Sequence, residues 1–366
     1  MKIKTLTKTL QKSLNNAEHF IGKNLDLPVL SCVLLETKNN FLVISATNIN
    51  TAFKVEIPVN VEEDGKVAVF GDVLARAVAG IKDEEIELAL EGNILRITSE
   101  KNNIELNTVD YSDFPAILDI DSMEDEPKIV SFKAKDFVSG INSVIYSVSK
   151  SNIKPELASV FFSVKDDEII FAATDGFRLA EKRIKKEKSD LEFSMLIPSD
   201  SAGIIAKILS GLENQNIDLY FYEKQFFIKA DDFVIFSRLT EGNYVDYQKL
   251  IPTDIETSLI ILKQDFLETS KLVNLFSDDF NQIKIKVDDK IVSFETKNNF
   301  GKNFNVIDAV VSGNDLEMSF NHKNILESFN SINTDSVEFV FNTGRPLLIK
   351  GVGDNSFKYI VMPLSK

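Results

Sequence analysis

One pattern of segments occurs three times in this 366-residue chain, and it constrains the fold more than any other feature. Two copies read VLLETKNNFLVISATNINTAFKV (33–55) and VFFSVKDDEIIFAATDGFRLAEK (160–182). In each, an alternating strand reaches a polar two- or three-residue turn and returns as a second strand. A looser third copy, IKIKVDDKIVSFETKNNFGKNFNV, covers 283–306. Such self-similarity predicts a repeated structural unit of about 120 residues.

A second family of segments repeats on the same spacing. Its members cover 94–117, 226–252 and 346–364, and they end VDYSDFPAI, EGNYVDYQKLIP and KYIVMPL. Each pattern predicts a hairpin followed by an extended segment with a proline at or near its close.

Helical signals precede each group of strands. The longer helices are predicted at 5–20, 134–148 and 263–276, and the shorter ones at 72–81, 200–210 and 322–332. Apolar residues at helical spacing mark the expected buried faces of the longer helices. These residues are Leu6, Leu10, Leu14 and Ala17; Phe137, Ile141 and Ile145; and, more loosely, Phe266, Leu272 and Leu275.

The unit is therefore helix, strands, helix, strands, and the chain is predicted to be α+β with three domains of one design. We expect the domains at 1–122, 128–252 and 253–366. The acidic segment DIDSMEDEP (119–127) is poor in apolar residues and is expected to be the first linker.

Composition and charge limit the function classes. The chain has no apolar run of 18 residues and no secretory leader, so we expect neither a membrane span nor secretion. The chain has one cysteine, which excludes an intramolecular disulfide framework and fits a reducing cytoplasm. This residue, Cys32, lies in an apolar run and is expected to be buried. The net charge of −15 argues against coating nucleic acid through bulk positive charge. The six helical segments, however, are nearly neutral, with eight basic and seven acidic residues.

The segment AATDGFRLA (172–180) follows a strand-like run and precedes a charged one. Asp-Gly between two apolar segments predicts a tight turn, because Gly accepts a positive φ and Asp tolerates it. The same place in the first unit carries Thr47 and Asn48, which match Thr174 and Asp175.

Three short motifs, in this order and combined with the threefold repeat, resemble one family over the whole chain. They are Ala173–Leu179 (ATDGFRL), SRL with EGNY at 237–244, and the terminal YIVMPL at 359–364. Asp113-Phe114-Pro115 closes the first unit in the same way. On these residues the chain resembles the bacterial DNA polymerase III beta subunit, the sliding clamp.

The resemblance implies a fold of three DNA-clamp domains, each with two helices packed on antiparallel sheets. Two copies would close head to tail into a homodimeric ring around double-stranded DNA, which holds DNA by topology rather than by base contacts. It further implies a cytoplasmic, non-catalytic processivity subunit without cofactor, metal or membrane contact. Its partners would be the DNA polymerase III alpha subunit, clamp-loader subunits and other proteins with clamp-binding motifs.

The resemblance also implies a hydrophobic groove between domains 2 and 3 that binds a short partner peptide. Its residues would be Leu157, Thr174, Gly176, Phe177, Arg178, Leu179, Val245, Lys249, Leu250, Pro346, Ile360, Val361, Met362, Pro363 and Leu364. Apolar side chains there could bury a partner's leucine and phenylalanine. By the same matching, Lys23, Ser151 and Lys154 would face DNA, and Ile104 and Leu106 would meet Leu275 and Phe276 at the dimer interface.

Three departures from the family pattern bear on these expectations. Val245 stands where a proline is usual, so this wall of the groove is expected to be less rigid. Ser199-Asp200 replaces a basic pair, which removes one expected DNA contact. The chain ends in Ser365-Lys366 rather than arginine-leucine.

Two alternatives belong to other classes. Asp113, Asp175, Asp246 and the pairs Asp166-Asp167 and Asp278-Asp279 could supply carboxylates to a metal-dependent hydrolase. No glycine-rich phosphate loop, nucleophile elbow or zinc spacing accompanies them. A repeat scaffold that does not bind DNA is the other alternative.

Overall fold

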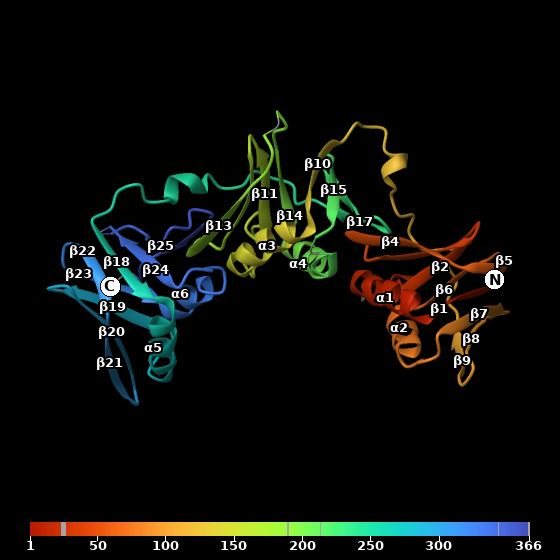
Figure 1. Ribbon diagram of the computed structural model, residues 1–366, viewed down its shortest axis with the longest axis horizontal. Coiled ribbons are helices and arrows are strands. Elements are labelled where there is room, and N and C mark those ends of the chain that lie inside the picture. The colour runs from red at the N-terminus through yellow and green to blue at the C-terminus, as the bar shows by residue number, and fades with distance from the viewer. Residues whose placement is uncertain (23–26, 189, 213, 343, 365–366) are drawn as a thin grey trace. The chain divides into compact units, whose positions relative to one another are not determined.

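The computed structural model describes residues 1–22, 27–188, 190–212, 214–342 and 344–364 (Figure 1). The chain forms two compact units, one of 1–135 with 204–239 and one of 136–203 with 240–366. The fold is α+β, with antiparallel sheets and, in the described residues, six α-helices. No described helix is both long enough and apolar enough to cross a membrane.

The same order of elements occurs three times. The first copy comprises β1 (Lys2–Leu6), α1 (Thr7–Ala17), β2 (Cys32–Lys38), β3 (Phe41–Thr47), β4 (Thr51–Pro58), β5 (Asn60–Glu63), β6 (Lys66–Phe70), α2 (Gly71–Ala79), β7 (Glu85–Glu91), β8 (Ile94–Thr98) and β9 (Asn103–Asn107). The second comprises β10 (Lys128–Lys133), α3 (Ala134–Val144), β11 (Ser159–Lys165), β12 (Glu168–Thr174), β13 (Arg178–Lys185), β14 (Phe193–Pro198), α4 (Ser199–Leu209), β15 (Asn216–Phe221), β16 (Gln225–Lys229) and β17 (Phe233–Arg238). The third comprises β18 (Thr257–Leu262), α5 (Lys263–Leu275), β19 (Gln282–Asp288), β20 (Ile291–Asn298), β21 (Gly301–Ile307), β22 (Ala309–Gly313), β23 (Leu316–Asn321), α6 (His322–Ser328), β24 (Ser336–Phe341), β25 (Leu347–Gly351) and β26 (Phe357–Val361).

Each copy contributes two blocks of four or five strands, and blocks of successive copies join edge to edge. In one unit an eight-stranded sheet has the order β10-β15-β16-β17-β4-β3-β2-β6, so β17 and β4 connect the second copy to the first. In the other unit a nine-stranded sheet has the order β14-β11-β12-β13-β26-β25-β24-β18-β22, so β13 and β26 connect the second copy to the third. The two remaining sheets are β5-β1-β7-β8-β9 and β21-β20-β19-β23, and their edges include β9 and β21.

The hairpins of the threefold pattern have short polar turns, as the sequence predicted. Two-residue turns join β2 to β3, β11 to β12 and β19 to β20, and in each the first turn residue has a positive φ. These residues are Asn39, Asp166 and Asp289, with φ of 56°, 51° and 46°. Asn and Asp tolerate this left-handed region better than other residues with a side chain, which explains the polar pairs in the sequence.

The helices occur where the sequence predicted them, but two of the expected faces are wrong. Leu6 is the last residue of β1 and is half exposed, so α1 buries Leu10, Leu14 and Ala17 without it. The buried side chains of α5 are Phe266, Ser270 and Val273. Leu272 and Leu275 are exposed because a helix turns by about 100° per residue, which carries them away from the face of Phe266.

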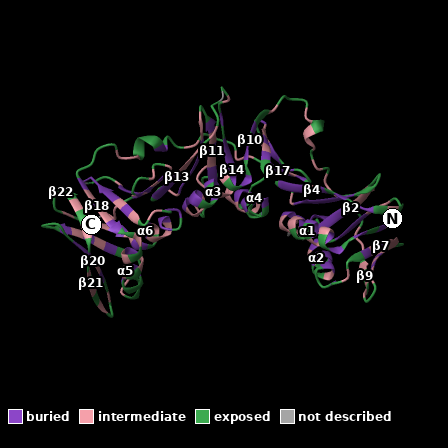
Figure 2. Cartoon of the chain, viewed as in Figure 1, coloured by how far each residue is buried: buried purple, intermediate pink, exposed green. Residues whose placement is uncertain are grey.

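Buried residues of the helices and strands form the core (Figure 2). Phenylalanine is frequent among them. In one unit Phe20 of the helix end stacks on Phe53 of β4, with ring centroids 5.3 Å apart. In the other, the Phe171 ring of β12 lies so close to Gly140 of α3 that a Cβ at Gly140 would overlap it. Glycine therefore permits this close approach of helix and sheet. Cys32 is fully buried, as expected, and burial raises the pKa of its thiol to about 11.

Candidate functional site

The candidate surface lies where β13 pairs with β26, at the junction of the second and third copies. The register is antiparallel, with Arg178 opposite Val361 and Leu179 opposite Ile360. At the end of the ladder the Met362 N–H donates to the Phe177 carbonyl oxygen over 2.8 Å. The turn before β13 and the C-terminal segment after β26 are thus joined through their main chains.

The turn that precedes β13 is held by its own side chains. The Asp175 carboxylate accepts hydrogen bonds from the main-chain N–H groups of Phe177 (2.9 Å) and Arg178 (3.0 Å). The Thr174 hydroxyl donates to the Arg178 carbonyl over 2.6 Å. Gly176 has a φ of 89°, which explains the glycine of the Asp-Gly motif.

The same bonds occur at the equivalent turn of the first copy. The Thr47 hydroxyl donates to the Thr51 carbonyl, and the Asn48 side-chain oxygen accepts from the N–H groups of Asn50 and Thr51. In the third copy Asn298 accepts from Phe300 and Gly301. Asn48, Asp175 and Asn298 therefore perform one structural role, since Asn and Asp side chains mimic a backbone turn.

Several predicted groove residues present apolar surface to solvent around this junction. Phe177 is 70% exposed, Leu250 51%, Met362 42% and Val245 41%. Leu157, Pro346, Pro363 and Leu364 are half-buried, and Gly176 and Lys249 are exposed. The last described residue, Leu364, is anchored because its N–H donates to the Ser319 carbonyl over 2.8 Å.

Other predicted groove residues lie beneath this surface. Leu179 and Ile360 are 2% and 3% exposed, and they belong to one apolar cluster with Tyr247. Val361 and Thr174 are also buried. Leu179 and Ile360 therefore support the junction from one face of the sheet, whereas Val361, the next residue of β26, points to the other face.

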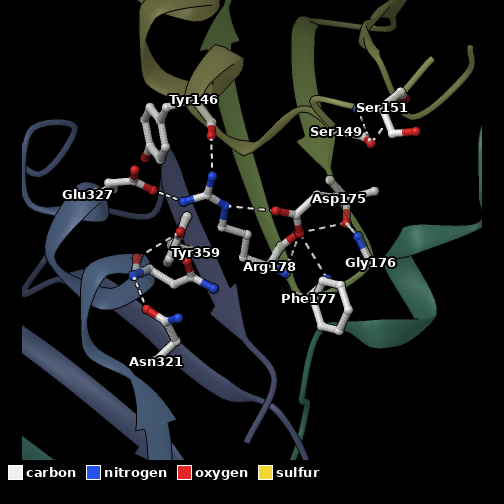
Figure 3. Close-up of polar contacts among 12 residues, drawn as sticks. Tyr146, Ser149, Ser151, Asp175, Gly176, Phe177, Arg178, Asn321, Glu327 and Tyr359 are labelled. Carbon is white, nitrogen blue, oxygen red and sulfur yellow. Dashed lines mark hydrogen bonds and ion pairs between the residues drawn. The ribbon is translucent and has the colours of Figure 1, made fainter. Parts of the chain in front are cut away.

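Arg178 is buried as well, and its guanidinium is fully engaged (Figure 3). Its Nε donates to Asp175 over 3.1 Å, and its Nη2 donates to the Tyr146 carbonyl over 2.6 Å. Its Nη1 forms an ion pair with Glu327 of α6. Arg178 thus connects the turn to the end of the α3 segment and to α6.

The segment between β17 and β18 packs against the same junction. The Tyr244 ring stacks on Phe161 of β11 with centroids 5.1 Å apart. The Tyr247 hydroxyl donates to the buried Glu181 carboxylate of β13 over 2.8 Å. Burial and this neighbouring carboxylate raise the pKa of Tyr247, so the phenol stays protonated and donates.

The predicted DNA-facing and dimer residues that the structure describes lie on several separate elements. Lys23 lies outside the described residues, and Ser151 and Lys154 are exposed in the loop before β11. Ile104 and Leu106 are half-buried on β9 of one unit. Leu275 is 69% exposed at the end of α5 in the other unit, and Phe276 beside it is half-buried.

Three carboxylates of the hydrolase alternative have structural partners. Asp175 holds a turn, Asp246 pairs with Lys249 over 2.6 Å, and Asp278 accepts N–H groups of its own loop. Among the described residues, no three His, Cys, Asp or Glu side chains gather as metal ligands would. These carboxylates form no common site for metal-assisted hydrolysis.

Sequence reasoning missed the polar residues that hold this junction together. They are Tyr146, Glu181, Arg183, Tyr247 and Glu327. Tyr247 and Glu181 carried a signal, because they lie in the VDY segment and in the repeat copy at 160–182 that the patterns singled out.

Comparison with known proteins defines the class. Models of the N-terminal, central and C-terminal domains of the DNA polymerase III beta subunit match residues 1–118, 131–246 and 248–365. The beta sliding clamp of Staphylococcus aureus is 26% identical over 365 residues, covering 96% of each chain. The Thermotoga maritima beta subunit superposes with a TM-score of 0.94 at 23% identity, over 100% of this chain and 99% of that one. The Bacillus subtilis clamp gives 0.93 at 22% identity, also over 100% and 99%.

Three domains of one repeated design, matched in order along the chain, define a DNA sliding clamp. The chain belongs to the DNA polymerase III beta subunit family. It is a processivity subunit that performs no catalysis of its own, and the hydrolase alternative is not supported.

Proposed function

We propose that two copies of this chain close head to tail around double-stranded DNA and present the β13–β26 junction to partner proteins. The polymerase alpha subunit, clamp-loader subunits and other proteins with clamp-binding motifs would dock there. The three domains are assigned to 1–122, 128–252 and 253–366, and the working location is the cytoplasm. The observation that carries the proposal is the pair of edge strands that the repeat leaves open.

Two of three equivalent junctions are closed within the chain. The three equivalent runs of strands are β2-β3-β4, β11-β12-β13 and β19-β20-β21. The last strand of the first run, β4, pairs with β17, and the last strand of the second, β13, pairs with β26. The last strand of the third run, β21, is an edge strand, and so is β9, which is equivalent to β17 and β26. Open strand edges carry unpaired N–H and C=O groups. Joining β21 to β9 of a second copy would complete the pattern twice and close a ring.

The β4–β17 junction also suggests a register for the open one. Thr51, the first residue of β4, faces Ser237. In the β16–β17 hairpin the pair beside the loop is Lys229 with Val234, and Ser237 lies three residues further on. In β8–β9 the corresponding pair is Thr98 with Asn103, and three residues further on is Leu106. Gly301, the first residue of β21, should therefore face Leu106 of the partner subunit.

This register sets complementary groups opposite each other. Lys302 would face Glu105 of the partner subunit, an opposite-charge pair that favours antiparallel pairing. Ile104 and Leu106, half-buried on β9, would gain apolar contact with Leu275 and Phe276 of the neighbouring subunit. Burying such side chains stabilises association by up to about 1.5–3 kcal/mol each before ordering costs.

DNA would be retained by enclosure. A nearly neutral helical lining permits sliding, since tight pairing with phosphates would resist it. Lys23, Ser151 and Lys154 are the proposed DNA-facing residues, and each adds a weak, salt-screened contact.

The partner-peptide site consists of the exposed junction residues and the buried residues that support them. It comprises Leu157, Thr174, Gly176, Phe177, Arg178, Leu179, Val245, Lys249, Leu250, Pro346, Ile360, Val361, Met362, Pro363 and Leu364. Exposed apolar side chains rimmed by polar ones are typical of docking sites, and the adaptable Met362 suits several partners.

Three measurements test the proposal. Sedimentation should give about twice the monomer mass of 41.1 kDa. The assembled protein should stay on closed circular DNA and be lost when that DNA is linearised, which a scaffold that does not bind DNA would not do. Deleting residues 362–366 should abolish binding of a labelled peptide ending in Leu-Phe while leaving the dimer intact; unchanged binding would remove the groove assignment.

A further inference from the structure

The segment 244–251, between β17 and β18, is fixed to the sheet through a buried polar contact outside the proposed peptide site. Tyr247 is 3% exposed and Glu181 of β13 is 1% exposed. The Tyr247 hydroxyl donates to Glu181 Oε2 over 2.8 Å. A buried, charge-assisted hydrogen bond of this length is stronger and more directional than one at the surface.

Glu181 is also held in place by contacts that do not involve Tyr247. Arg183 donates from Nε to Glu181 Oε1 over 2.8 Å and from Nη2 to Oε2 over 3.1 Å. Arg183 Nη1 donates to Glu168 of β12 over 2.8 Å. This two-pronged arrangement fixes the orientation of the carboxylate, so that Tyr247 has one preferred position.

Fixing Tyr247 also fixes the exposed residues beside it. Asp246 has φ −73° and ψ 71°, and the Tyr247 N–H donates to the Val245 carbonyl over 2.7 Å, which together define an inverse γ-turn. The short helix η6 (Tyr247–Leu250) begins at the same tyrosine and carries Lys249 and Leu250. Val245 and Leu250, both exposed, therefore lie within three residues of one anchored side chain.

The repeat places an analogous anchor at the first junction. Lys54 is the fourth residue of β4, as Glu181 is the fourth residue of β13. Lys54 Nζ donates to Asp119 Oδ2 over 2.6 Å, and Asp119 belongs to the first interdomain segment. The fourth residue of β21 is Phe304, which is 55% exposed in the described chain. The segments that contain Asp119 and Tyr247 are thus each bound to the fourth residue of a strand, the first by an ion pair and the second by a tyrosine–carboxylate hydrogen bond.

We propose that Tyr247 and Glu181 are a positioning pair for the partner-peptide site. They hold Val245 and Leu250 over the Leu179–Ile360 cluster in the geometry that receives an apolar peptide. Neither has to touch the peptide. This inference rests on the proposed function of the junction, and it explains how a wall with Val245 stays ordered without the rigidity of proline.

Pre-organisation predicts a specific kinetic effect. A wall ordered before binding spares the peptide the cost of ordering it, and differences between related complexes arise mostly in dissociation. Tyr247→Phe removes one hydroxyl and keeps the ring that packs on Phe161. We expect it to weaken binding of a fluorescein-labelled peptide ending in Leu-Phe about threefold to tenfold, through faster dissociation.

A matched control is Lys54→Met, which breaks the analogous anchor at the first junction. It should leave peptide affinity unchanged. Glu181→Gln keeps an oxygen acceptor for Tyr247 and should retain more affinity than Glu181→Ala. Hydrogen exchange should show 245–250 protected in the free wild-type protein, and protected only after peptide addition in Tyr247→Phe.

The outcomes separate this inference from the proposal on which it rests. If the wild-type protein does not bind the peptide, or if Met362→Asp does not weaken binding, the peptide site itself is wrong. If Met362→Asp weakens binding while Tyr247→Phe binds and releases the peptide like the wild type, the positioning role is overturned. Equal weakening by Lys54→Met would also overturn it, because the effect would then be general loosening.

Discussion

Nη2 of Arg178 donates to the main-chain carbonyl of Tyr146 over 2.6 Å, although 32 residues separate them in the sequence. The same guanidinium binds Asp175 of the turn and Glu327 of α6. One buried cation therefore joins three segments of the second and third copies. This arrangement explains why the turn motif carries an arginine whose side chain is only 8% exposed.

Removing that cation should destabilise the unit that contains it. Arg178→Met leaves the Asp175 and Glu327 carboxylates, which are 22% and 42% exposed, without their partner, and the loss should cost about 1.5–3 kcal/mol. Urea unfolding followed by circular dichroism measures the loss. Arg76→Met is the control, because Arg76 pairs with Asp72 on an exposed helix surface, where a pair contributes less than about 0.5 kcal/mol. Equal effects of the two variants would contradict the role assigned to Arg178.

Two glycines inside helices should respond oppositely to the same substitution. Gly140→Ala drives a Cβ into the Phe171 ring and should lower the free energy of unfolding by about 1–3 kcal/mol. Gly203→Ala in α4 meets Ile145 at an ordinary 3.5 Å, and it should raise stability by about 0.4–1 kcal/mol through helix propensity. Thermal unfolding of both variants tests the close packing of α3. A stable Gly140→Ala protein would show that the helix can move off the sheet.

The protein should become less stable as the pH is lowered, because His322 is protonated more readily in the unfolded chain. This residue is 1% exposed, and neither ring nitrogen has a hydrogen-bond partner among the described residues. Burial, with a smaller effect of Lys323, lowers its pKa. Because the folded pKa lies below the ordinary value of about 6.5, the contribution is complete above that pH and is lost as the pH falls.

Urea midpoints at pH 7.5, 6.5 and 5.5 measure this contribution. One proton contributes at most about 1.4 kcal/mol per pH unit. His322→Leu should flatten the dependence, whereas His19→Leu, at a more exposed histidine, should flatten it less. An unchanged slope in His322→Leu would assign the pH dependence to other groups.

The proposed subunit register can be tested by disulfide formation. Lys302→Cys combined with Glu105→Cys should cross-link two subunits under mild oxidation, because opposite residues of paired strands lie within disulfide range. Lys302→Cys with Asn107→Cys shifts the register by two residues and should cross-link poorly. The natural Cys32 is buried and adds little background. Preferential cross-linking of the shifted pair would show that the proposed register is wrong. No cross-linking of either pair would contradict the proposed pairing of β21 with β9.

Much of this architecture could be predicted from the sequence, because local signals and the repeat agree. The polar turns at Asn39, Asp166 and Asp289 and the helix positions follow from residue preferences within each segment. Three copies of weak signals also reinforce one another. The wrong face of α5 arose because Leu272 and Leu275 are apolar yet exposed, and apolar character alone does not decide burial.

The site was less predictable for a physical reason. Its contacts join segments far apart in the chain, such as Tyr247 with Glu181, 66 residues away. A glutamate in a charged strand is normally predicted to be exposed to solvent. Only the tertiary fold supplies the arginine and tyrosine that permit its burial. Leu179 and Ile360 likewise could be assigned to floor or rim only once the packing of Tyr247 was known.

Phe304, at the strand position that Lys54 and Glu181 occupy elsewhere, is exposed and lies on the strand proposed to pair with a second subunit. This difference affects the stability of the proposed ring. The first two junctions are each crossed by a peptide tether, and a short tether keeps its ends at a local concentration in the millimolar range. The β21–β9 seam has no tether, so its closure depends on how many subunits are present. Dilution should therefore split the assembly at that seam, while the other two junctions reclose as often as they open.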